Sequence, residues 1–183
     1  MTDEVAQNEV GLGRWLLELV AMVGTAFVLA LAIKTWVVQP FIIPSGSMIP
    51  TLEINDRVLV NKFIYHFRQP ERGDIVVFSN PQYDPVVKTL IKRVVAVGGD
   101  TVDIKDGKLW VNGKPVNEPY VHGLPTNPTV VKMPVKIPAG NVFLMGDNRT
   151  NSQDARWFGP QPVTRIEGEA FCIYWPLSGI KAL

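Results

Sequence analysis

Two serines and one lysine are the residues of this chain best suited to nucleophilic chemistry. Ser45 and Ser47 flank a glycine in the segment PSGSMIPTL at residues 44–52, and Lys92 lies in LIKRVV at residues 90–95. A serine hydroxyl attacks a carbonyl when a base takes its proton, and a neutral lysine amine can be that base. These residue types point to acyl transfer. The simpler interpretations are that residues 44–52 form a polar turn and that Lys92 lies on an edge strand and faces water.

The position of Lys92 in its segment bears on its protonation. On a strand, alternate residues share one face, which here holds Leu90, Lys92, Val94 and Ala96. Apolar neighbours remove water from the ammonium group and lower its pKa from about 10.4 toward neutrality. We therefore expect Lys92 to be a general base if this face is buried.

A third segment, GDNRTNSQDAR at residues 146–156, is dense in hydrogen-bonding groups and directly follows the apolar VFLM. One interpretation is a surface loop with a local ion pair between Asp154 and Arg156. The other is a rigid polar loop that orients the catalytic groups.

Residues 15–38 are expected to form a single membrane-spanning anchor. A helix of this length covers about 36 Å, more than the roughly 30 Å of a bilayer core. Its two charges, Glu18 and Lys34, lie near the ends, and Trp15 and Trp36 mark the two interfaces. A core helix is disfavoured because no polar stripe interrupts the apolar residues. A cleaved signal peptide is the other alternative, since Ala30–Ala32 resembles a small-x-small cleavage site.

After Pro40 the pattern predicts a mostly β domain over residues 39–183, built as an antiparallel barrel or folded sheet. Short apolar runs separated by turn residues indicate the strands. Asp106-Gly107 and Asn112-Gly113 predict two-residue hairpins. The expected strands are residues 57–61, 74–78, 90–97, the hairpin strands within 101–116, 130–137, 141–145 and 163–175.

Composition excludes several classes of function. The net charge of +1 provides no basic field for nucleic acid. The single cysteine, Cys172, cannot form a disulfide within the chain. With two histidines and no cluster of metal-ligating residues, we expect no metal and no cofactor.

The ordered segments together resemble type I signal peptidases of the bacterial and organellar branch, which use a Ser-Lys dyad. The resemblance runs from the membrane span to Arg156 and rests on PSGSMIPTL, NDRVLVNK, RGDIVVF followed by LIKRVV, and GDNRTNSQDAR. It implies that Ser47 is the nucleophile and Lys92 the general base. It also implies that the Ser45 hydroxyl joins the Ser47 N–H in the oxyanion hole.

Further roles follow from the same resemblance. Ser152 is expected to orient the lysine, and Asp154 and Arg156 to support the shape of the site. The sequence departs from the family pattern at Gly98-Gly99-Asp100, where Pro-Gly-Asp is usual, and at Thr150 and Ala155, where Asp and Ser are usual. None of these positions carries an expected catalytic role.

The resemblance implies a membrane-bound endopeptidase that removes signal peptides from exported preproteins after small-x-small sites, through an acyl-enzyme. Residues 41–44 and 90–91 are expected to accept the extended substrate by strand addition. We expect shallow pockets for small side chains, formed by Ile43, Pro44, Met48, Leu52, Leu90 and Ile91.

The resemblance, not the flanking charge, also gives an orientation. Residues 1–14 are expected in the cytoplasm and the β domain on the extracytoplasmic face of a bacterial cytoplasmic membrane, near the secretion translocon. A thylakoid membrane is the alternative. The expected partners are preproteins and the lipid bilayer.

Other functions remain open at this point. A Ser-Lys autopeptidase of the SOS-repressor kind would need a DNA-binding module, whose place the span takes here. A specialised processing peptidase would share every motif. A tethered binding domain would tolerate replacement of Ser47 and Lys92. A Ser-His-Asp hydrolase is disfavoured because His66 and His122 lie in segments typical of the surface.

Overall fold

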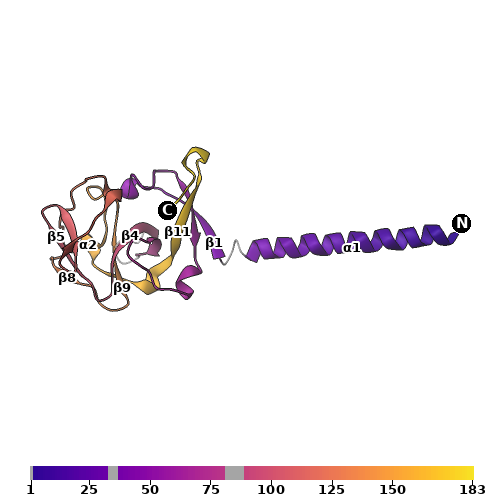
Figure 1. Cartoon of the computed structure of the whole chain (residues 1–183), viewed down its shortest axis with the longest axis horizontal. Helices are drawn as coiled ribbons and strands as arrows, with labels where there is room; N and C mark the ends of the chain where they lie inside the picture. Colours follow the sequence, from indigo (N-terminus) through magenta and orange to yellow (C-terminus); the bar gives the residue numbers. More distant parts are fainter. Residues whose placement is uncertain (1, 33–36, 81–88) are drawn as a thin grey trace. The chain divides into compact units, whose positions relative to one another are not determined.

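The computed structural model describes residues 2–32, 37–80 and 89–183, which divide into two units at Val38 (Figure 1). The first unit holds the helix α1, Thr2–Ala32. Its stretch Gly13–Leu31 is long and apolar enough to cross a bilayer, and none of it is buried in the protein. These properties are those expected of the predicted anchor.

The limits of the anchor differ from the expected 15–38. The helix begins at Thr2, so it includes the segment expected before the span, and its last described residue is Ala32. Val38, the expected last residue of the span, is instead the first residue of strand β1. Lys34 and Trp36, which were expected to mark one interface, lie outside the described residues.

The second unit consists of two antiparallel sheets. The larger has the order β1-β2-β11-β3-β4-β9-β10, with β12 paired to β11, and the smaller has the order β7-β6-β5-β8. Figure 1 shows β4 and β9 between the side that carries β5 and β8 and the side that carries β1 and β11. The mostly antiparallel β fold expected from the sequence is confirmed.

The larger sheet contains β1 (Val38–Ile42), β2 (Arg57–Asn61), β3 (Ile75–Ser79), β4 (Thr89–Val97), β9 (Asn141–Met145), β10 (Gln161–Pro162), β11 (Ile166–Trp175) and β12 (Lys181–Ala182). The smaller contains β5 (Thr101–Lys105), β6 (Lys108–Val111), β7 (Lys114–Pro115) and β8 (Val135–Lys136). Short helical segments are η2 (Gly46–Met48), η3 (Ile64–His66), η4 (Pro119–Val121), α2 (Ala155–Phe158), η5 (Val163–Arg165) and η6 (Leu177–Gly179).

The two predicted hairpins form as expected. Asp106-Gly107 joins β5 to β6, and Asn112-Gly113 joins β6 to β7. All four residues have positive φ angles between 51° and 75°, which is the backbone that a two-residue turn matched to the strand twist requires.

Two expected strands are shorter than predicted. Of residues 130–137, the strand β8 includes only Val135 and Lys136. The segment that begins at Val163 first forms the helical turn η5, and β11 follows from Ile166. The two-residue strands β10 and β12 were not predicted.

Strand β4 is central because it pairs with β3 on one side and β9 on the other. Val94 is buried in one apolar cluster with Leu90 packed against that cluster. A register shift follows Val94, and Ala96 belongs to a second cluster. The alternation expected from the sequence therefore holds for Leu90 and Val94 but is wrong for Ala96.

Candidate active site

The side chains of Ser47 and Lys92 meet in the interior of the second unit. Ser47 is in the helical turn η2 and is 9% exposed, while Lys92 is on β4 and is 2% exposed. The Lys92 Nζ lies 2.7 Å from the Ser47 Oγ and 2.9 Å from the Ile91 carbonyl oxygen. At 2.7 Å a protonated amine donates to the hydroxyl, and a neutral amine can accept the hydroxyl proton.

Burial changes the protonation of this lysine. Desolvation lowers the pKa of Lys92 from 10.5 to about 8, because the charged form loses its water. The negative charges of Asp154 and Asp147 act in the opposite direction and raise the pKa of the amine. A substantial fraction of the amine is therefore neutral in mildly alkaline solution.

The loop expected from residues 146–156 lies directly against the turn that carries Ser47. The Asn148 N–H donates to the Ser47 carbonyl at 3.1 Å, and the Asn148 Nδ2 donates to the Gly46 carbonyl at 3.0 Å. A Cβ atom on Gly146 would lie 2.4 Å from the Ser47 carbonyl oxygen. Only glycine therefore allows this close approach of the two loops.

Ser45 and Ser152 were expected beside the dyad, and both lie near it. Ser45 is exposed and precedes η2, where its side chain makes no capping hydrogen bond. The Ser152 hydroxyl is buried beside Gly146, and among the described residues it has no hydrogen-bond partner. The expected hydrogen bond from Ser152 to Lys92 is thus absent, and the amine is directed to Ser47 and the Ile91 carbonyl.

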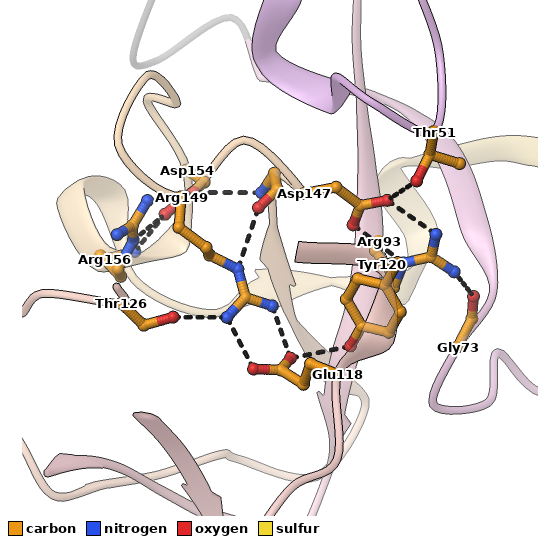
Figure 2. A network of polar contacts seen from close by, with 11 residues as sticks. Thr51, Gly73, Arg93, Glu118, Tyr120, Thr126, Asp147, Arg149, Asp154 and Arg156 are labelled. Carbon is orange, nitrogen blue, oxygen red and sulfur yellow. Dashed lines mark hydrogen bonds and ion pairs between the residues drawn. The ribbon is translucent and has the colours of Figure 1, made fainter. Parts of the chain in front are cut away.

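The predicted pair of Asp154 and Arg156 forms inside the protein. The two carboxylate oxygens accept from Arg156 Nε at 2.9 Å and Nη2 at 2.8 Å. Asp154 also accepts from the Gly146 N–H at 3.1 Å (Figure 2). The pair therefore holds the loop at the point where Gly146 approaches Ser47.

A second buried ion pair was not predicted from the sequence. Arg93, next to Lys92, donates through Nε and Nη2 to Asp147 at 2.9 Å and 2.7 Å, and Asp147 also accepts from the Thr51 hydroxyl. Figure 2 shows these contacts. The position of Arg93 directly after the lysine was the signal available in the sequence, but a pair 54 residues apart leaves no local pattern.

A third pair joins the same loop to the segment after β7. Arg149 donates to Glu118, to the Thr126 hydroxyl at 2.7 Å and to the Gly146 carbonyl at 3.0 Å. The ring of Tyr120 lies 4.1 Å from the Arg93 guanidinium and 6.0 Å from that of Arg149. The three guanidinium groups of Arg93, Arg149 and Arg156 thus fix the loop on several sides (Figure 2).

A cleft of about 380 Å³ opens beside the dyad. Four of the six residues predicted to form the substrate pocket line it, namely Ile43, Pro44, Leu90 and Ile91, and so do Ser45 and Lys92. Met48 and Leu52, which were also predicted, are fully buried in the core beneath and do not reach the cleft. They belong to the core cluster that contains Ile43 and Ile91, and the sequence could not tell a core side chain from a lining one.

The described residues contain no group of three or more His, Cys, Asp or Glu side chains that could hold a metal ion.

Comparison with known proteins identifies the family. The family model described as "Signal peptidase, peptidase S26" matches residues 16–175. Signal peptidase I of Leptolyngbya laminosa is 40% identical over 173 residues, covering 92% of this chain and 84% of the relative. Signal peptidase I of Bacillus licheniformis is 34% identical over 189 residues, covering 99% and 98%.

Two further proteins are similar over smaller shares. A probable thylakoidal processing peptidase 2 of Arabidopsis thaliana is 39% identical over 86% of this chain and 43% of its own length. The crystal structure of a signal peptidase I from Enterococcus faecalis aligns with a TM-score of 0.46 and 28% identity, covering 56% of this chain and 97% of that one.

The family match includes the turn of Ser47, the strand of Lys92 and the loop of residues 146–156. The chain therefore belongs to the signal peptidase family, peptidase S26, and is a serine-protease-type hydrolase of that family.

Proposed function

We propose that this chain cleaves N-terminal signal peptides from exported preproteins, with Ser47 as nucleophile and Lys92 as general base. The observation that carries the proposal is the 2.7 Å contact between the Ser47 Oγ and a lysine amine that is 2% exposed. Among the described residues no carboxylate is in hydrogen-bond contact with this amine, so an ion pair does not explain its burial. Beside a serine hydroxyl the amine has the properties of a base.

The reaction has two stages. Neutral Lys92 takes the proton of the Ser47 hydroxyl while the oxygen bonds to the scissile carbonyl carbon. The resulting oxyanion accepts hydrogen bonds from the Ser47 N–H and the Ser45 hydroxyl, and Lys92 then protonates the leaving amine. In the second stage water, deprotonated by the same lysine, attacks the acyl-enzyme and releases Ser47.

The cleft supports specificity for small residues. An extended peptide fits between residues 41–45 and 89–92, where backbone hydrogen bonds give affinity and side-chain pockets give selectivity. Ile43 and Ile91 are almost fully buried, so they close the cleft from beneath. We expect only small side chains at the first and third positions before the cleaved bond.

The apolar helix and the relatives support a membrane location. We place residues 1–14 in the cytoplasm, the apolar stretch that begins at residue 15 in the cytoplasmic membrane of a bacterium, and residues 39–183 on its extracytoplasmic face near the translocon. The thylakoidal relative makes a thylakoid membrane the alternative.

The direct test uses the full-length chain in detergent with a preprotein that carries an Ala-x-Ala site. Cleavage after the final Ala, measured by product mass, is expected for the wild type and absent in Ser47→Ala and Lys92→Ala. Cleavage that survives in Lys92→Ala would disprove the base assignment. A folded wild type that cleaves neither this precursor nor a panel of others would support a binding domain instead, and cleavage of one of the others alone would indicate a specialised peptidase.

Ser45→Ala tests the contribution of the oxyanion hole separately from that of the nucleophile. Loss of one oxyanion donor costs about 10²–10³-fold in kcat. We therefore expect measurable residual activity in Ser45→Ala and none in Ser47→Ala, in the same mass assay. Equal loss in the two folded variants would contradict these separate roles.

A further inference from the structure

The peptide group between Gly46 and Ser47 has two ends with different environments. Its N–H belongs to the nucleophilic residue, and no described residue accepts a hydrogen bond from it. Its carbonyl oxygen accepts from the Ile49 N–H at 3.3 Å and from the Asn148 Nδ2 at 3.0 Å. A peptide group is planar, so a contact that fixes the carbonyl also fixes the direction of the N–H. Hydrogen bonds in series also polarise one another, which makes this N–H a stronger donor.

The backbone of Asn148 is held in place from both sides, and its side-chain oxygen accepts from the Thr150 hydroxyl at 3.3 Å. Its backbone N–H donates to the Ser47 carbonyl at 3.1 Å. The preceding residue, Asp147, is fixed by Arg93 and Thr51, and the following one, Arg149, by Glu118 (Figure 2). A donor supported in this way keeps its orientation during the reaction, which is the condition for electrostatic preorganisation.

We propose that Asn148 is a positioning residue for the oxyanion hole. Through its Nδ2 it orients and polarises the Gly46–Ser47 peptide, so that the Ser47 N–H points at the developing oxyanion. The inference rests on the proposed function, because it assigns the Ser47 N–H the role of oxyanion donor.

Asn148→Ala isolates this contact. The backbone N–H of residue 148 still reaches the Ser47 carbonyl, and the Gly46 carbonyl keeps the Ile49 N–H. The two loops therefore stay joined, while the side-chain donor is lost. We expect kcat to fall about tenfold, the rate equivalent of one ordinary hydrogen bond. KM should stay unchanged, because the cleft residues are untouched.

The experiment measures kcat and KM of the full-length variant in detergent on the Ala-x-Ala preprotein, across a range of pH. The apparent pKa of the rate should remain that of the wild type, because the burial of Lys92 and its two aspartates are unchanged. Asn141→Ala is the matched control. It removes the same amide, which donates to the Ala139 carbonyl at 3.1 Å on the exposed surface, and it should leave kcat unchanged.

A peptide aldehyde ending in Ala-x-Ala distinguishes a positioning role of Asn148 from a purely structural one, because a structural role would not weaken the aldehyde selectively. Its carbonyl carbon bonds reversibly to the Ser47 Oγ, the hydroxyl proton passes to Lys92, and the aldehyde oxygen becomes an oxyanion in the hole. Its inhibition constant should rise about tenfold in Asn148→Ala. The product peptide, which binds without an oxyanion in the hole, should bind as it does to the wild type.

Several results would overturn the proposal. Unchanged kcat in Asn148→Ala would do so, and so would equal weakening of the aldehyde and the product peptide, which indicates a role in shaping the cleft. A shifted apparent pKa would mean that Asn148 acts through Lys92. If Asn148→Ala does not fold, Asn148→Asp keeps the shape without the donor and should lose at least as much kcat at the plateau of its own pH profile. Unchanged kcat there would equally reject the role.

Failure of the proposed function is distinguishable from failure of this inference. An inactive wild type, or cleavage that persists in Ser47→Ala, rejects the function. If the wild type is active and Asn148→Ala has the same kcat, only the positioning role is rejected.

Discussion

In the proposed mechanism the amine of Lys92 can serve as a base because burial makes its charged form unfavourable. The sequence predicted this from the apolar neighbours of Lys92 on an expected strand, and burial in the structure agrees. The resemblance to the family named Ser47 as its partner, but the contact joins residues 45 positions apart, and strand geometry alone did not give it. The ion pairs of Arg93 and Arg149 were not predicted, because long-range pairs of this kind leave no periodicity in the chain.

The dependence of activity on pH follows from the pKa of Lys92. Since the base must be neutral, kcat/KM should increase tenfold per pH unit below about 8 and reach a plateau above it. Initial rates of preprotein cleavage between pH 6 and 10 measure this. A rate that is flat or falls across this range would contradict the assignment of Lys92 as base.

The same pKa makes a prediction about stability. The pKa of Lys92 is lower in the folded protein, so the unfolded chain binds more protons between about pH 8 and 10.5, and the wild type gains stability as pH rises through that interval. Below it, the buried ammonium costs about 3 kcal/mol. Lys92→Met should therefore stabilise the protein most at pH 7, and the difference should shrink toward pH 10.5. Thermal unfolding in detergent at several pH values tests this, and a difference independent of pH would contradict it.

At the scale of elements, the site depends on how closely the loop after β9 approaches η2. The strands β2 and β9 and both hairpins were predicted because local sequence determines them: short apolar runs for the strands and Asp-Gly or Asn-Gly for the turns. Strands β10 and β12 were not, because two residues carry no pattern and take their conformation from the strand beside them. The expected strand at 130–137 was too long, since apolar residues between prolines also suit a loop.

Gly146→Ala tests the close approach of the two loops. The added Cβ would lie 2.4 Å from the Ser47 carbonyl oxygen and 2.6 Å from the Ser152 Cβ, so the turn that carries Ser47 must move. A displacement of about 1 Å costs on the order of 10²-fold in rate. We expect at least that loss of kcat in the preprotein assay. Gly179→Ala, whose Cβ would make only ordinary contacts with Pro176, is the control. Full activity in Gly146→Ala would show that the loop can shift without any loss of kcat.

At the scale of the whole molecule, the chain combines an apolar helix with a β unit that contains every residue of the proposed chemistry. The sequence predicted this division but extended the span into β1, because Val38 is apolar and suits a helix and a strand equally. The structure assigns it to β1. The division means that anchoring and catalysis are separable by experiment.

Removal of residues 1–37 tests that separation. The remaining chain keeps β1 and the complete cleft, so it should fold and cleave a soluble Ala-x-Ala peptide with the kcat/KM of the full-length protein. Cleavage of a preprotein inserted in vesicles should fall by about 10²-fold or more, because enzyme and substrate no longer share one surface. Equal loss on both substrates would mean that the helix contributes to the β unit itself.

The length of chain between Ala32 and Val38 limits how far the first residue of β1 can lie from the end of the helix. Fully extended, the chain from Ala32 to Val38 reaches at most about 20 Å, and β1 leads directly into the cleft. Under the proposed anchoring, this chain length sets an upper limit on the distance between the lipid surface and the first residue of β1. The enzyme would then select precursors by the height of the scissile bond as well as by its sequence. A precursor in which a long spacer separates the Ala-x-Ala site from the apolar segment of the signal peptide should therefore not be cleaved, although the sequence of its site is suitable.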